Sequence, residues 1–217
     1  MVKISVTSKL DGIKSWSLQA VDTCAGSKDK SGELVPACQG CYARYGNYNY
    51  PNVKSIREYN REDYKRGEWV NDMVQALQDS RFFRWFDSGD IVSLELAWKI
   101  YDIVRLTPWC QHWLPTRMEK FEKFKRVIDK IRTLPNAAVR FSSDGIDGEY
   151  EPGLHGSVIV QSIDDVTPEM KPCLAYEHGG KCSGCRACWD KSIPVIAYIA
   201  HGKVPKAKYR KIIMSKA

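Results

Sequence analysis

The chain has 217 residues, 43% of them hydrophobic, which is enough to bury the core of a single domain over residues 1–217. No apolar run approaches the roughly 20 residues of a membrane-spanning helix, and residues 1–7 lack the apolar region of a signal peptide, so we expect a cytoplasmic protein without membrane contact. The formal net charge of +7 is partly local, because residues 203–217 carry six Lys or Arg side chains and no acid; this basic tail predicts either a nucleic-acid contact or a solvated terminus.

The first part of the chain predicts strands, a loop and then helices. Residues 3–7 and 16–20 are short β-prone runs, and the second run leads into a loop over residues 24–41 that is rich in Gly, Ser and Pro. Helices are expected at residues 55–65 and 69–77, and the second has apolar side chains at helical spacing.

From residue 82 onward, strand-like segments alternate with helix-like ones. Strands are expected at residues 82–86, 111–115, 137–141, 157–161 and 195–200. Ser93 is a candidate N-cap for the helix after the first strand, and residues 121–134 have the apolar spacing of a second helix. This alternation predicts an α/β fold with parallel strands, either a partial (β/α) barrel of about six parallel strands or a small open sheet.

Polar residues follow several of these predicted strands at the point where each strand ends. They include Ser88, Gly89, Asp90, Arg117, Ser142 and Asp144. The carboxyl ends of parallel strands meet at one edge of a sheet, and ligands of α/β proteins bind at that edge. The sequence therefore predicts a pocket there for a small-molecule cofactor or substrate, with the first cysteine loop beside it.

Seven of the eight cysteines fall into two groups that have the spacing of metal ligands. The first group is Cys24, Cys38 and Cys41, and the second, in the Cys-rich segment 173–193, is Cys173, Cys182, Cys185 and Cys188. In a reducing compartment such clusters are more typical of metal sites than of disulfides. Thiolates suit iron–sulfur clusters, zinc and copper(I), and three cysteines stepping two residues apart favour a [4Fe–4S] cluster over zinc.

The first group offers three thiolates where a cluster has four corners. Either a fourth ligand comes from elsewhere, or one iron stays open to a small molecule, or a single cluster takes cysteines from both groups. The number of clusters, one or two, is left open by the spacing. The remaining cysteine, Cys110, is expected to be a small buried hydrophobic residue.

In combination, residues 22–44, 86–90, 113–117 and 173–188 resemble a phage-encoded iron–sulfur family labelled gene product eighty-eight, over roughly residues 15–200. That family is similar to a minimal radical S-adenosylmethionine (SAM) enzyme. The resemblance implies a radical-SAM-like fold in host cytoplasm, with a [4Fe–4S] cluster on the first cysteine group and an auxiliary cluster on the second. It also implies SAM at the strand ends, with its amino group at Ser88-Gly89-Asp90 and its ribose and carboxylate at Arg117, Ser142 and Asp144.

Two kinds of function follow from these observations. The first is an enzyme that cleaves SAM reductively. The alternative is a non-catalytic iron–sulfur protein for electron transfer, redox sensing or association with nucleic acid. The tyrosines of residues 42–50 are expected either to shield a cluster from water or to stack on bases, and shielding is favoured. No catalytic side chain or substrate is assigned.

Overall fold

The computed structural model describes residues 1–200, and the basic tail predicted at residues 203–217 lies outside them. Over residues 1–200 the fold is α/β, with eight strands in the order β1-β2-β3-β4-β5-β6-β8-β7. Strand β1 is antiparallel to β2, and all the other pairs are parallel. The strands are β1 (Ser5–Thr7), β2 (Ile13–Trp16), β3 (Phe82–Trp85), β4 (Gln111–Thr116), β5 (Ala137–Ser142), β6 (Gly156–Val160), β7 (Met170–Cys173) and β8 (Val195–Ile199). The α/β class and the mostly parallel sheet are confirmed, and the sheet is open rather than closed into a barrel.

Five α-helices accompany the sheet in the described part of the chain. They are α1 (Pro36–Gln39), α2 (Pro51–Asp63), α3 (Trp69–Ala76), α4 (Leu94–Leu106) and α5 (Glu122–Thr133). Ser93 caps α4 as expected, since its Oγ accepts a hydrogen bond from the Leu96 N–H at 3.1 Å. None of the helices within residues 1–200 is both long and apolar enough to cross a membrane.

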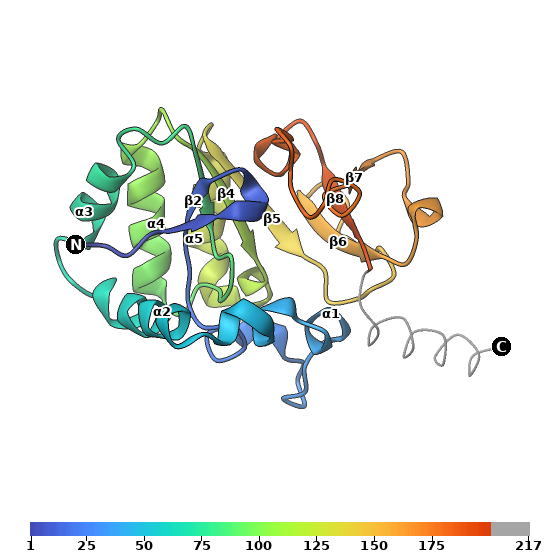
Figure 1. Ribbon diagram of the computed structural model, residues 1–217, viewed down its shortest axis with the longest axis horizontal. Coiled ribbons are helices and arrows are strands. Elements are labelled where there is room, and N and C mark those ends of the chain that lie inside the picture. The colour runs from blue at the N-terminus through green and yellow to red at the C-terminus, as the bar shows by residue number, and fades with distance from the viewer. Residues whose placement is uncertain (201–217) are drawn as a thin grey trace.

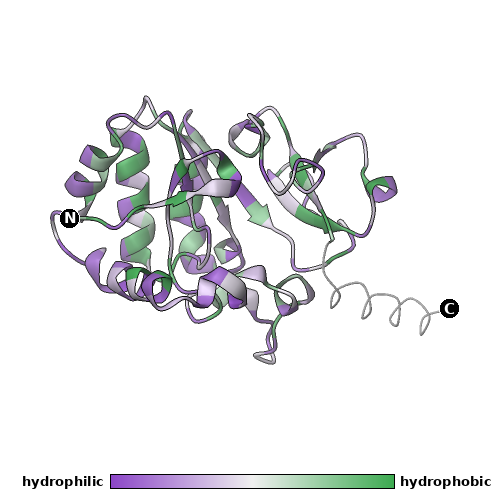
Figure 2. Ribbon diagram, viewed as in Figure 1, coloured by the Kyte–Doolittle hydropathy of each residue, from purple (hydrophilic) through white to green (hydrophobic). Residues whose placement is uncertain are grey.

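Helices cover one face of the strands β2 to β5 (Figure 1). Side chains alternate along a strand, so Phe83 and Trp85 of β3 enter the main core with α3, α4 and α5, while Phe82 and Arg84 lie on the other face. Trp16, Trp69 and Trp85 pack edge to face or tilted in this core and are fully buried. Figure 2 shows α4 banded in hydrophobic and hydrophilic residues, as expected for a helix with one buried side.

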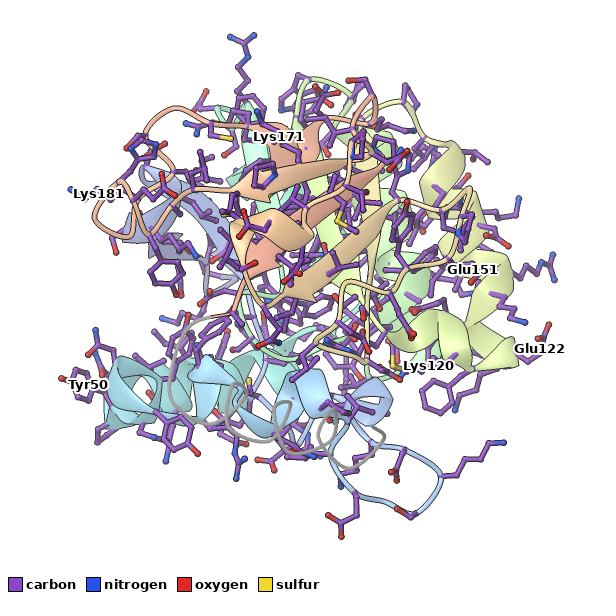
Figure 3. All side chains as sticks on the ribbon, turned by 90° about the vertical axis from the view of Figure 1, so that its right-hand side faces the viewer. Tyr50, Lys120, Glu122, Glu151, Lys171 and Lys181 are labelled. Carbon is purple, nitrogen blue, oxygen red and sulfur yellow. The ribbon has the colours of Figure 1, made fainter. Side chains whose placement is uncertain are left out.

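Within residues 1–200, none of the helices α3, α4 and α5 packs against the other face, called here the inner face. Instead, the segment between β7 and β8 lies over it, with the Trp189 ring 5.2 Å from that of Trp113 and the Trp189 indole N–H donating to the Phe83 carbonyl at 2.8 Å. The segment that contains α1 and leads to α2 runs beneath the sheet in both views (Figures 1 and 3). These two irregular segments carry the two cysteine groups, so the topology brings both to one side of the sheet.

Strand β7 was not predicted. The strand expected at residues 16–20 is found earlier in the chain, as β2 at Ile13–Trp16, and shares only Trp16 with the prediction. Pro172 has no N–H to donate, which argues against a strand in sequence reasoning, but β7 is an edge strand, where a missing donor is tolerated. After Trp16 the chain is held by loop contacts, such as the bond from the Leu18 N–H to the Ser88 carbonyl at 3.0 Å.

Candidate functional site

A cavity of about 440 Å³ lies between the inner face and the two cysteine segments. Its size falls within the range of small-molecule sites. Six of the seven grouped cysteines line it, and they are Cys24, Cys38, Cys41, Cys173, Cys182 and Cys188. Cys185 is exposed and lies outside the lining, and Cys110 is fully buried in the main core, as expected for a small hydrophobic residue. All eight thiols are free.

The first cysteine group lies in and around the short helix α1. Cys38 lies in the short helix α1, and the Cys41 N–H donates to the Cys38 carbonyl at 3.2 Å. Burial raises the pKa of the Cys24 thiol to about 12, and the Asp90 carboxylate and the thiols of Cys38 and Cys41 add to this effect. The other two thiols of this group thus act on Cys24.

The second group begins where β7 ends, at Cys173, and continues in a turn in which the Cys185 N–H donates to the Cys182 carbonyl at 2.9 Å. The pKa of Cys182 is raised by burial first and then by the neighbouring Cys173 thiol. Burial raises the pKa of Cys188 to about 11, and Cys173 contributes there too. The Cys173 thiol thus acts on both Cys182 and Cys188.

Asp11 anchors the turn between Cys182 and Cys185 to the loop between β1 and β2. Its carboxylate accepts from the backbone N–H groups of Ser183 at 3.2 Å and Gly184 at 2.9 Å, and from Arg186 Nη1 at 2.8 Å. The Gly184 bond is the largest of the causes that hold the pKa of Asp11 below its usual value. Sequence reasoning missed Asp11, because no local pattern links it to a turn at the other end of the chain.

Arg140 of β5 anchors the rest of the second segment. Its guanidinium donates five hydrogen bonds, at 2.7 to 3.4 Å, to the backbone carbonyls of Ala187, Cys188, Asp190, Ile193 and Pro194. The side chain is fully buried on the inner face. Arg140 therefore fixes the backbone that carries Cys188, and it too was missed, since an Arg inside a predicted strand gives no sign of such a role.

Ser88, Gly89 and Asp90 line the cavity but are largely engaged with the protein itself. Ser88 Oγ donates to the Leu18 carbonyl at 2.7 Å. The Asp90 carboxylate accepts from Ile91 N–H, Thr116 Oγ and Arg117 N–H at 2.7 to 2.9 Å, and burial raises its pKa. In this structure Asp90 fastens the end of β4 to the loop after β3.

The other three candidate residues lie at the next strand ends. Arg117 and Ser142 line the cavity, whereas Asp144 does not. Arg117 Nη2 donates to the Ser143 carbonyl at 2.8 Å, and its Nε lies 3.4 Å from Asp144 Oδ1. Asp144 also pairs with Lys120, labelled in Figure 3. Five of the six residues predicted from the strand ends thus meet at the cavity.

The tyrosines of residues 42–50 divide into two pairs. Tyr42 and Tyr48 line the cavity with ring centroids 5.4 Å apart, and both hydroxyls donate to Asp87 at 2.9 Å, one to its carbonyl and one to its carboxylate. Tyr45 and Tyr50 do not line the cavity and are 59% and 55% exposed, while Tyr42 is itself 50% exposed. Only the first pair has the position that a shielding role needs.

The donor arrangement bears on the type of metal group. Within residues 1–200 no three His, Cys, Asp or Glu side chains converge as the ligands of one metal ion do. A zinc ion draws its sulfur ligands to about 2.3 Å from one point. A [4Fe–4S] cluster instead spreads its thiolates around the corners of a cube, and the type of metal group stays a prediction.

The fold and this site define an α/β protein with an open, mostly parallel sheet and a cysteine-lined cavity on the sheet's inner face. The chain belongs to the Gene product 88 family, whose model matches residues 3–191. No curated protein and no solved structure matches it. The family resemblance is thus confirmed, while the iron–sulfur and radical-SAM relationships stay predictions.

Proposed function

We propose that this protein binds [4Fe–4S] clusters in the inner-face cavity, the first held by Cys24, Cys38 and Cys41. The observation that carries the proposal is the meeting of six grouped cysteines around one cavity, although they come from opposite ends of the chain. Thiolates are the ligands that such clusters require, and a cavity walled partly by apolar side chains limits the access of water. A bound cluster supplies one-electron chemistry.

A second cluster is proposed on Cys173, Cys182, Cys185 and Cys188. Cys185 is exposed while the other three line the cavity, so this cluster would lie at the cavity's edge. Asp11 and Arg140 position its backbone through the bonds described above. Tyr42 and Tyr48, which also line the cavity, would help to exclude water.

Reductive cleavage of SAM is a second candidate function, favoured by the three-thiol first group beside a cavity of about 440 Å³. Three thiolates would leave one iron without a protein ligand. Arg117 and Ser142 are the lining residues best placed to meet the ribose and carboxylate of SAM, while Asp90 would need to exchange internal hydrogen bonds for its amino group. Without SAM chemistry, the protein would act in electron transfer, redox sensing or association with nucleic acid.

The test is to purify the full chain anaerobically and to measure iron, sulfide and the electron paramagnetic resonance spectrum after reduction, with and without SAM. Cys41→Ala should lose the signal of the first cluster. Cys110→Ala is the matched control, because Cys110 is buried in the main core, and its iron content should equal that of the wild type. A spectrum that shifts with SAM supports SAM chemistry, and zinc in place of iron, or iron loss in Cys110→Ala, refutes the proposed ligands.

A further inference from the structure

Arg57, Arg84 and Asp87 form a buried group of charges next to the cavity. Arg57 Nη2 lies 3.8 Å from Asp87 Oδ2, and Arg84 Nη1 lies 3.4 Å from Asp87 Oδ1. The side chains are only 5%, 11% and 16% exposed for Arg57, Arg84 and Asp87. Two guanidinium cations thus share one carboxylate, which leaves one positive charge to be balanced, and an unbalanced buried charge is costly.

Arg84 and Trp113 each have an N–H without a hydrogen-bond partner. Both Arg84 Nε and Trp113 Nε1 are buried, and both residues line the cavity. The other bonds of Arg84, to the Tyr42 hydroxyl at 3.3 Å and to Asp87 at 3.4 Å, are long compared with the roughly 2.7–2.9 Å of a good charged pair. Buried donors without acceptors are rare in native proteins and call for an explanation.

The two donors are held as a pair by the sheet itself. Arg84 of β3 and Trp113 of β4 are direct neighbours in the register of the parallel strands, so both side chains project from the inner face. The Arg84 guanidinium lies over the Trp113 ring, 4.5 Å from its centroid. Rigid strands therefore hold the unbalanced charge against the Trp113 ring.

We propose that this pair binds an oxyanion, the carboxylate or phosphate of a small-molecule ligand that enters the cavity. A guanidinium matches the planar geometry of such an anion, and the indole N–H adds one donor. Lys9 and Arg117 also line the cavity, while the carboxylate of Asp90 is engaged with backbone and hydroxyl donors. This subsite goes beyond the proposed cluster binding and does not require it, because the charge count involves no metal.

Isothermal titration of the anaerobically purified full chain with inorganic phosphate and with acetate, at constant ionic strength, tests the subsite. The wild type should bind one of the two probes saturably, and the probe that binds tells phosphate from carboxylate. Arg84→Gln should weaken binding at least tenfold, and Trp113→Phe, which keeps a ring but removes the N–H, should weaken it several-fold. Arg81→Gln is the control, because Arg81 is exposed just before β3 and should bind as the wild type does.

Cluster-bound thiolates are the competing source of negative charge, since Arg84 is near enough to Cys188 to affect its pKa. Binding of the probe should therefore persist in Cys41→Ala, whether or not that variant loses iron. Absence of saturable binding by the wild type, or equal binding by Arg84→Gln, overturns the subsite. Loss of probe binding in Cys41→Ala also overturns it. The same holds if the wild type binds no probe and Arg84→Gln loses iron. Either result would mean that the positive charge of Arg84 is balanced by the thiolates of a cluster.

Discussion

Replacing Arg140 by Met tests whether one buried side chain holds the second cysteine segment on the sheet. Arg140 is fully buried, and its five N–H donors all reach carbonyls of residues 187–194. Met keeps much of the aliphatic volume but offers no donor. The substitution therefore removes all five bonds at once and leaves their acceptors facing the sheet.

The size of the loss can be bounded from these contacts. A hydrogen bond to a charged group contributes about 1.5–3 kcal/mol, and five of them would add up to about the whole stability of a domain. The loop can relax and admit water, so the sum is an upper limit. A buried carbonyl left without a donor costs about 1–3 kcal/mol, and since water can reach some of the five, we expect the free energy of unfolding of Arg140→Met to fall by about 3–5 kcal/mol.

Urea denaturation followed by tryptophan fluorescence and circular dichroism measures this change. Trp189 lies within the affected segment and reports on it, since its ring packs against Trp113 on the inner face. Arg105→Met is the matched control, because Arg105 forms an exposed pair with Asp102 at 3.4 Å and should change stability by no more than about 0.5 kcal/mol. A loss below about 1 kcal/mol in Arg140→Met would refute the anchoring role.

Two further predictions concern the core and the loop after β3. Gly89→Ala should lower the free energy of unfolding, measured by thermal denaturation, by more than about 2 kcal/mol, because Gly89 has φ +81° and an added Cβ would lie 2.6 Å from Leu18 Cβ. The control Gly32→Ala should lose only about 1 kcal/mol, because its φ is +86° but nothing lies within 4 Å of an added Cβ. Equal losses in the two variants would contradict the steric argument. Burial lowers the pKa of His112 to about 3, so the unfolded chain alone gains this proton below about pH 6.5, and stability should fall by about 2 kcal/mol from pH 7 to pH 5. Denaturation of His112→Gln across that range should lack this component, and an unchanged slope would show that His112 does not cause it.

The neutral state of His112 has a structural reason as well as burial. Trp85 Nε1 donates to His112 Nδ1 at 3.2 Å. Thr107 Oγ1 lies 2.8 Å from His112 Nε2, and because its own hydrogen is donated to the Ile103 carbonyl, it accepts from the ring. The ring therefore accepts at Nδ1 and donates at Nε2. A second proton on Nδ1 would point at the Trp85 N–H, so protonation requires the core to open.

Much of the fold was predictable because it rests on local patterns. The strands β3, β4, β5, β6 and β8 begin and end within one residue of the predicted positions, since each is a compact apolar or β-prone run between turn residues. Helix α2 begins four residues before its predicted start, at Pro51, a residue type that commonly opens helices. Strand β7 could not be predicted locally, because only its pairing with β8 makes Lys171 and Pro172 extended.

The site was predictable in its residue types but not in its supports. Cysteine spacing and polar strand ends led to most of the lining residues, because both signals are short-range. Arg84 and Arg140 gave no such signal, since each looks like an ordinary strand residue until neighbouring strands place it on the inner face. Their importance depends on contacts between segments far apart in the sequence, which periodicity does not encode.

The one-sided placement of the helices links folding to the proposed function. A parallel sheet normally has both faces covered by helices, yet here the inner face of β3 to β5 is covered by short turns and loops. Such segments bury little apolar area, and their order depends on anchors such as Arg140 and Asp11. Cluster binding by these segments would stabilise their folded arrangement, because a metal group that binds only the folded state contributes its binding free energy to that state. Loss of metal should therefore expose the inner face first and leave the helix-covered core of Trp16, Trp69 and Trp85 intact.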